Sequence, residues 1–194
     1  MDVFALVVRP ALLCATVGFF SNLFKGDGRS KSDSNPTDDW PASAGETPHV
    51  SFDRQALESF GSRLRFGDGL EAARLFGRPD TFESGAASFT LTYKRWALSL
   101  GFELGKFVHA TYAIGESIRD RDNAGAPRAE PRGPDGLRLT ARTTKSELLR
   151  RFGQPSKLQE LDGEVVLYYE HGPLISEFQL DDEDRLTGWD VYVD

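Results

Sequence analysis

The sequence repeats one pattern after an interval of 76 residues, and this repeat constrains the fold more than any other feature. Phe76-Gly77-Arg78-Pro79 returns as Phe152-Gly153-Gln154-Pro155. The same interval matches Leu91 with Leu167, Tyr93 with Tyr169 and Phe102 with Phe178. A spacing shared by a turn motif and two apolar segments predicts two copies of one small structural unit.

Each copy begins with signals for a short helix. In the second copy Thr144 and Glu147 form a capping box, in which the Thr hydroxyl accepts from a free amide of the first turn. Phe152-Gly153-Gln154-Pro155 ends that helix, because Gly adopts the left-handed cap and Pro cannot continue the helix. The first copy has an equivalent start at Asp68-Gly69-Leu70-Glu71. A further helix is predicted from Asp53 to about Arg65, where apolar residues recur at helical spacing: Phe52, Ala56, Leu57, Phe60 and Leu64.

Antiparallel strands are predicted after each helix. In the second copy they cover 157–161, 164–169, 174–180 and 185–193, with a two-residue hairpin signal at Asp162-Gly163. Leu174, Ser176, Phe178 and Leu180 alternate with Ile175, Glu177 and Gln179, and the first copy alternates in the same way at Leu98, Leu100, Phe102 and Leu104. This period of two predicts sheets with one buried face and one wetter face.

The expected fold class is therefore α+β, with two tandem helix-plus-antiparallel-sheet repeats and the helices packed on one face of each sheet. The predicted division is an apolar or amphipathic N-terminal segment (1–24), repeat unit 1 (52–118) and repeat unit 2 (137–194). Residues 25–51 and 119–136 are expected to be flexible linkers, because they are rich in Gly, Pro, Ser and charged residues.

The charge is concentrated in the second copy. Residues 144–194 contain five Lys or Arg and twelve Asp or Glu, so this stretch carries the net charge of −7 of the whole chain. Nucleic-acid binding is not expected, because it requires a basic surface. A basic protein partner is compatible with the charge.

The single cysteine, Cys14, excludes an internal disulfide and a cysteine-based zinc site, which suits a reducing compartment.

The apolar N-terminal segment has three interpretations. A signal peptide needs a basic start, but the chain begins Met1-Asp2. A membrane span has about the right length, but Arg9 and Pro10 interrupt it, and the basic residues that follow would hold that end in the cytoplasm. In the third interpretation Val17 is the true start, and residues 17–25 form a short amphipathic segment that docks peripherally on a membrane surface or on a partner. A cytoplasmic or inner-membrane-surface location is favoured over export.

The order of helix, Phe-Gly-x-Pro and antiparallel strands resembles the SmpA/OmlA outer-membrane assembly lipoproteins, and the tandem arrangement resembles the beta-lactamase inhibitor proteins. The residues that carry the resemblance are Thr144, Glu147, Leu148, Phe152, Gly153, Pro155, Tyr169, Phe178 and Trp189. It implies a non-catalytic protein that binds other proteins through exposed sheet faces and loops. Leu13 stands where the lipoproteins have a small residue before the acylated cysteine, and one cysteine cannot supply the disulfides of the inhibitors.

Residues with catalytic or metal-binding chemistry are sparse. The histidines are His49, His109 and His171, and no Ser-His-Asp or Cys-His order is recognisable around them. Asp181-Asp182-Glu183-Asp184 lacks the alternating order of a calcium loop and is expected to be a solvated turn. We therefore expect no enzymatic activity, no cofactor and no metal.

The alternation instead points to the outward face of the second copy. If Leu167, Tyr169 and Trp189 point inward, neighbouring residues point outward and form an amphipathic patch: Tyr168, Ile175, Gln179, Asp190 and Tyr192. Tyrosine is common at interface hot spots. The favoured hypothesis is a non-enzymatic protein–protein interaction module, with an unidentified protein partner. The alternatives are a small-ligand-binding or enzymatic domain that uses a cleft between the two units with His109 and His171, and an inhibitor or immunity protein with a basic target.

Overall fold

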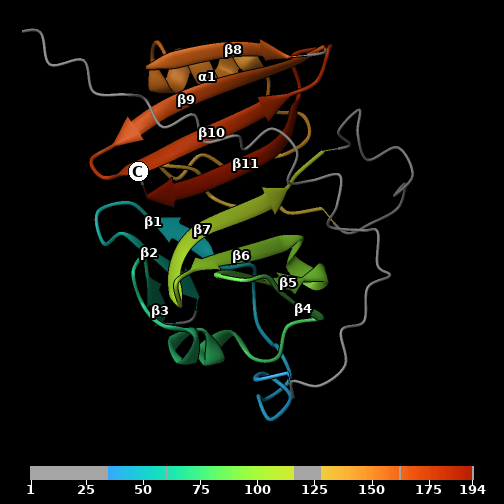
Figure 1. The fold of residues 1–194 in the computed structure, drawn as a ribbon. Coiled ribbons are helices and arrows are strands. Elements are labelled where there is room, and N and C mark those ends of the chain that lie inside the picture. Colours follow the sequence, from blue (N-terminus) through green and yellow to red (C-terminus); the bar gives the residue numbers. More distant parts are fainter. Residues whose placement is uncertain (1–34, 60, 116–127, 162, 194) are drawn as a thin grey trace, which may run out of the picture. The chain divides into compact units, whose positions relative to one another are not determined.

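The computed structural model describes residues 35–59, 61–115, 128–161 and 163–193, which form two antiparallel sheets (Figure 1). The smaller sheet consists of β1 (His49–Ser51), β2 (Ala56–Ser59) and β3 (Ser62–Arg65). The larger consists of β4 (Thr81–Ser84), β5 (Ser88–Tyr93), β6 (Leu98–Glu103), β7 (Lys106–Ala113), β8 (Lys157–Leu161), β9 (Glu164–His171), β10 (Leu174–Leu180) and β11 (Leu186–Val193). The helical elements of the described chain are the 3-10 helices η2 (Leu70–Phe76) and η3 (Lys94–Trp96) and the α-helix α1 (Lys145–Phe152).

The larger sheet has the strand order β4-β5-β6-β7-β11-β10-β9-β8. Each half is a four-stranded meander, and the two meanders join where β7 pairs antiparallel with β11. The first residues of β4, β5 and β6 precede those of β8, β9 and β10 by 76 residues, the interval of the sequence repeat. The repeated segments thus build one continuous sheet.

The repeated residues make equivalent contacts in the two halves. The Tyr93 hydroxyl donates to the Gly77 carbonyl at 3.1 Å, and the Tyr169 hydroxyl donates to the Gly153 carbonyl at 3.2 Å. Both tyrosines lie on the core side of the sheet, and both glycines follow a helical segment. The hydrogen bond fastens the end of each helical segment to the second strand of its meander.

The predicted α+β class is wrong, because the structure is mostly β and few of its described residues are helical. The helix expected from Asp53 to Arg65 is the β2–β3 hairpin, which turns at Gly61 with a φ of 79°. Leu57 lies directly opposite Leu64 in that hairpin, and both are fully buried. A separation of seven residues suits one face of a helix, but it also suits two cross-strand partners.

The helix starts differ between the copies. In α1 the amide of Glu147 donates to the Thr144 hydroxyl at 3.3 Å, so the predicted N-cap is confirmed. The first copy forms only the 3-10 helix η2, whose N-cap is Gly69. Glycine has no side chain to accept from the free amides, so this start lacks the hydrogen bond that stabilises α1.

The hydrophobic core lies on one side of the larger sheet. The smaller sheet contributes Leu57 and Leu64 to it, and α1 contributes Leu148. Phe178 and Trp189 stack at 5.9 Å between ring centroids, and Trp189 stacks on Tyr112 of the first half at 5.2 Å. The predicted inward positions that are buried are Leu91, Tyr93, Leu98, Leu100, Phe102, Leu167, Tyr169, Leu174, Phe178, Leu180, Trp189 and Val191.

Two residues that were predicted to point into the core are exposed in the structure. Leu104 is 83% exposed, because it occupies the two-residue turn between β6 and β7, where Glu103 pairs with Lys106. Val193 is 38% exposed at the end of β11. The alternation of β6 therefore stops one residue before the repeat suggests.

Several predictions fall on residues outside those described, including the N-terminal segment 1–24, the membrane-contacting segment 17–25 and Cys14. Within the described chain, no helix combines the length and apolar character that crossing a bilayer requires. The described end of the predicted linker 25–51 contains β1 and the buried Trp40. Part of that segment therefore belongs to the folded structure.

Candidate functional site

The five predicted binding residues lie on one face of the larger sheet, opposite the core, which we call the polar face. Ile175 of β10 lies directly opposite Tyr192 of β11. Glu177, two residues further along β10, pairs with Tyr168 on one side and with Asp190 on the other. Because cross-strand partners project to the same side of a sheet, Tyr168, Ile175, Gln179, Asp190 and Tyr192 share this face.

Asp190 is the centre of a hydrogen-bonded network, although it is only 5% exposed. Its Oδ1 accepts from the Thr111 hydroxyl and lies 3.2 Å from Nε2 of His109. Its Oδ2 accepts from Nε2 of Gln179 at 2.7 Å. Both oxygens of this buried carboxylate therefore have partners, as a buried charge requires.

Glu177 is the second buried carboxylate of the network, with 9% exposure. It faces Asp190 directly across the strands, and like charges in this position repel each other. Burial and the charge of Asp190 raise the pKa of Glu177 from 4.5 to about 7, although hydrogen bonds from Gln179 and Tyr192 and the charge of His109 act in the opposite direction. Glu177 therefore changes its charge near neutral pH.

His109 on β7 is the titratable base of the network, and its side chain is 25% exposed. Burial lowers the pKa of His109, but the hydrogen bond and charge of Asp190, with the charges of Glu177 and Glu103, outweigh burial and raise it above 6.5. Protonated His109 and neutral Glu177 thus coexist in mildly acidic solution. At higher pH Glu177 becomes negative and His109 loses its positive charge, so the network as a whole becomes more negative.

Two half-buried tyrosines flank the carboxylate pair. Tyr168 lies beside Glu177, and Nζ of Lys157 lies 5.0 Å from the centre of its ring. Tyr192 meets the ring of His109 edge-on, with 5.7 Å between centroids. Burial, with the charges of Glu177 and Asp190, raises the pKa of Tyr168 to about 12, so its hydroxyl stays protonated. Carboxylates framed by aromatic rings are suited to binding a cation.

Three members of this network were not among the five predicted binding residues: Glu177, Thr111 and His109, the last of which was predicted only for the alternative cleft. Glu177 lies in the alternation between Ile175 and Gln179, so the sequence contained a signal for it. His109 and Thr111 reach the site because β7 pairs with β11, with Thr111 opposite Asp190. No sequence signal specified that pairing between the copies.

The histidines His109 and His171 lie on opposite sides of the larger sheet. His109 faces Tyr192 on the polar face. The ring of His171 packs against Phe52, with centroids 4.6 Å apart, and Phe52 also stacks on Trp189 of the core. Burial lowers the pKa of His171, so its ring favours the neutral form. A cleft that combines these two histidines is not formed by the described residues.

The polar face is acidic. Glu83, Glu103, Glu170, Glu177 and Asp190 lie on it, against Lys106 and Lys157. The described residues contain no group of three His, Cys, Asp or Glu arranged to hold a metal ion. The chemistry present on this face is thus that of a hydrogen-bonding, negatively charged surface with aromatic edges.

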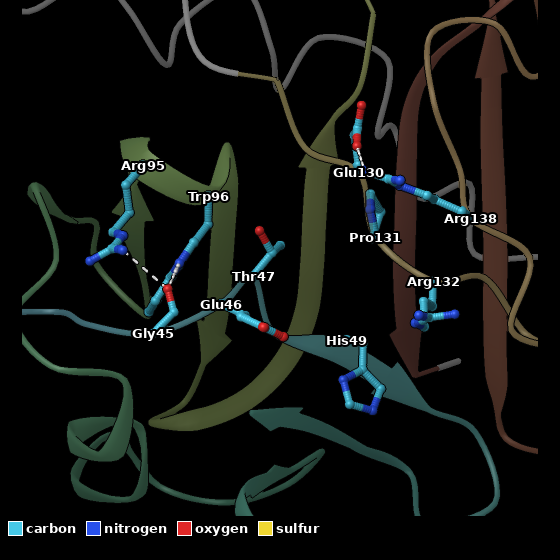
Figure 2. A pocket seen from close by; sticks show the side chains of 10 residues that line it. All are labelled: Gly45, Glu46, Thr47, His49, Arg95, Trp96, Glu130, Pro131, Arg132 and Arg138. Carbon is cyan, nitrogen blue, oxygen red and sulfur yellow. Dashed lines mark hydrogen bonds and ion pairs between the residues drawn. The ribbon is translucent and has the colours of Figure 1, made fainter. Parts of the chain in front are cut away.

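A pocket of about 510 Å³ lies away from the polar face, between the segment before β1, η3 and the segment 130–138 (Figure 2). Its lining residues are Gly45, Glu46, Thr47, His49, Arg95, Trp96, Glu130, Pro131, Arg132 and Arg138. None of them was predicted as a site residue. The repeat could not reveal this pocket, because most of its lining lies in the segments predicted as linkers.

No protein-family model matches the sequence, and no curated protein matches it. Among solved structures, the chain is similar to the DUF4309-family protein YjgB from Bacillus subtilis, with a TM-score of 0.46 and 12% identity over 74% of this chain and 90% of that chain. It is also similar to an extracellular SCP-domain protein from Bacillus anthracis (TM-score 0.48, 10% identity, 88% of this chain and 50% of that one). A cysteine-rich secretory protein from Staphylococcus aureus gives a TM-score of 0.44 and 12% identity, with 80% of this chain and 50% of that chain covered. The chain spans half the length of the latter two proteins.

Proposed function

We propose that this protein is a non-enzymatic interaction module that binds a protein partner through the polar face of its larger sheet. The observation that carries the proposal is the pair Glu177 and Asp190, two carboxylates that are buried side by side. Within the described residues, His109 is the one basic side chain that forms an ion pair with this pair of carboxylates. A cationic group from outside would relieve the repulsion that this pair carries.

The partner's contact segment is expected to be basic. A Lys or Arg side chain seated over Glu177 would interact with both carboxylates, and Tyr168 and Tyr192 would contact its aliphatic or planar part. The surrounding acidic residues of the polar face would attract the same segment before contact. A basic protein segment is therefore the occupant that the charge and the aromatic edges favour.

Affinity purification from the native cells with three proteins tests the proposal. The first is the wild type, the second carries Tyr168→Ala and Tyr192→Ala, and the third carries Thr90→Ala and Thr92→Ala. The threonines lie on the same side of the larger sheet but in the other half, so the third protein is a matched control. We expect the wild type and the threonine variant to recover the same partner and the tyrosine variant to lose it.

The recovered partner is then titrated with purified protein. Removal of two central tyrosines is expected to weaken binding at least about tenfold, since such residues commonly contribute more than ~1 kcal/mol each. Added salt is expected to weaken binding to the wild type further. Equal affinity of the tyrosine variant and the wild type would exclude the polar face as the binding surface.

A further inference from the structure

One wall of the pocket is a hairpin that places two arginines opposite each other. Arg132 and Arg138 are antiparallel bridge partners. The amide of Leu139 donates to the Pro131 carbonyl at 2.9 Å, and the fully buried side chain of Leu139 anchors the hairpin in the core. The two arginines thus start from neighbouring, fixed backbone positions on one side of the pocket.

The charges of these two arginines are unequally compensated. Arg138 forms an ion pair with Glu130, which also lines the pocket. Arg132 is exposed, and the described residues offer its guanidinium no ion-pair partner. Because no carboxylate of the described residues pairs with Arg132, its positive charge at the pocket is uncompensated.

The opposite wall holds a third arginine without a carboxylate. Arg95 donates to the main-chain carbonyls of Ser43 at 2.8 Å and Gly45 at 3.1 Å. Its guanidinium carbon lies 5.4 Å from the ring centre of Trp96, which is buried. Neutral carbonyls and an aromatic ring fix the orientation of this guanidinium without removing its net charge. Figure 2 shows Arg95 and Trp96 on one side of the pocket and Arg132 and Arg138 on the other.

The sum of the lining charges is positive. The three arginines face two carboxylates, Glu46 and Glu130, and only Glu130 is engaged by an arginine of the lining. The volume of about 510 Å³ suits a small molecule, since such sites commonly measure about 300–1,000 Å³. Guanidinium groups bind phosphate and carboxylate through paired N–H donors.

We infer that this pocket binds a small anion that carries phosphate or carboxylate groups, held by Arg132 on one wall and Arg95 on the other. Two separated arginines favour a ligand with two anionic groups over a monovalent ion. The site is independent of the polar face, so the inference does not depend on the proposed partner.

Pyrophosphate and citrate serve as probes of the two chemistries, each titrated into the full-length protein by calorimetry against sodium chloride of matched ionic strength. Saturable binding of either probe supports the inference, and the stronger probe identifies phosphate or carboxylate as the preferred group. Arg132→Gln is expected to weaken the binding about tenfold or more, as the loss of a charge-assisted hydrogen bond predicts. Arg132→Lys is expected to retain part of the affinity.

Arg142→Gln is the matched control, because Arg142 is exposed and lies outside the lining. A second readout needs no variant: the changes in backbone amide chemical shifts when a probe is added to the wild type. These changes are expected in residues 45–49, 94–96 and 130–138. The inference fails if neither probe binds beyond chloride or if Arg132→Gln lowers the affinity no more than the control Arg142→Gln does. It also fails if the chemical-shift changes lie in other residues.

Discussion

Glu177 and Asp190 are direct cross-strand partners on β10 and β11, and each is no more than 9% exposed. Two neighbouring carboxylates withdrawn from water destabilise the fold that contains them. The network of Thr111, His109 and Gln179 reduces this cost through hydrogen bonds to Asp190. Glu177 accepts from Nε2 of Gln179 at 3.4 Å and from Tyr192, and it is the member whose pKa rises to about 7.

Glu177→Gln is expected to stabilise the protein in a pH-dependent way. A carboxyl whose pKa is raised on folding binds its proton more tightly in the folded state, so its contribution is most favourable below 4.5 and is lost as the pH rises to about 7. The variant should therefore gain about 1–3 kcal/mol in unfolding free energy at pH 8 and little at pH 5. Urea unfolding at the two pH values measures this. Glu170→Gln, at an exposed position of β9, is the control, and an equal gain at both pH values would argue against the assigned cause.

Binding of a basic partner to the polar face is expected to strengthen between pH 6 and pH 8. Over this range Glu177 loses its proton, and His109, whose pKa lies above 6.5, loses part of its positive charge. Both changes make the face more negative. The recovered partner is titrated at both pH values against the wild type and Glu177→Gln. We expect the variant to bind more weakly and with less dependence on pH, and affinity independent of pH in the wild type would rule out the carboxylate pair as the contact.

The repeat-equivalent glycines Gly77 and Gly153 are expected to differ in their tolerance of alanine. Their backbones are alike, with φ and ψ of 77° and −174° at Gly77 and of 80° and −156° at Gly153. Such a conformation costs a residue with a Cβ about 1–3 kcal/mol. At Gly77 a Cβ would also lie 2.6 Å from Cα of Ser43, whereas at Gly153 it would meet nothing within 4 Å.

Gly153→Ala should therefore lose only the cost of backbone strain, and Gly77→Ala should lose about 2 kcal/mol more, because the backbone at Ser43 must move. Thermal and urea unfolding of the two variants provide the comparison. Equal losses would show that the segment around Ser43 does not pack against Gly77 in solution.

Thr144→Ala is expected to destabilise the protein by about 1 kcal/mol, the usual cost of removing an N-cap hydroxyl. The lost contact is the hydrogen bond from the Glu147 amide at 3.3 Å. Thr144→Ser keeps the hydroxyl and should retain most of the stability in urea unfolding. A serine variant as unstable as the alanine variant would mean that the methyl group of Thr144, and not its cap, is the important part.

The strands of the second copy could be predicted closely because their side chains alternate strictly. Each of the four predicted strands begins and ends within two residues of β8, β9, β10 or β11. The β2–β3 hairpin was misread because the spacing of Leu57 and Leu64 fits a helix as well as a hairpin. Gly61, at the turn, was the signal against a helix, since glycine inside a helix is unfavourable.

The candidate site could be predicted only in part, for a related reason. Alternation places Tyr168, Gln179 and Asp190 on one side of their own strands, and the register confirms this. It contains no information about which strand of one copy lies beside which strand of the other. His109 joins Asp190 across 81 residues of sequence, and no turn links β7 to β11 to indicate their pairing.

The two halves of the larger sheet are joined by the pairing of β7 with β11, and the protein can be divided into two fragments at this junction. Without its counterpart, either half would present a strand with unpaired amides and carbonyls along a full edge, which recruits other strands. The two halves, produced as separate polypeptides, should therefore find each other and restore the sheet. A chain that retains only one half should instead pair with another copy of itself.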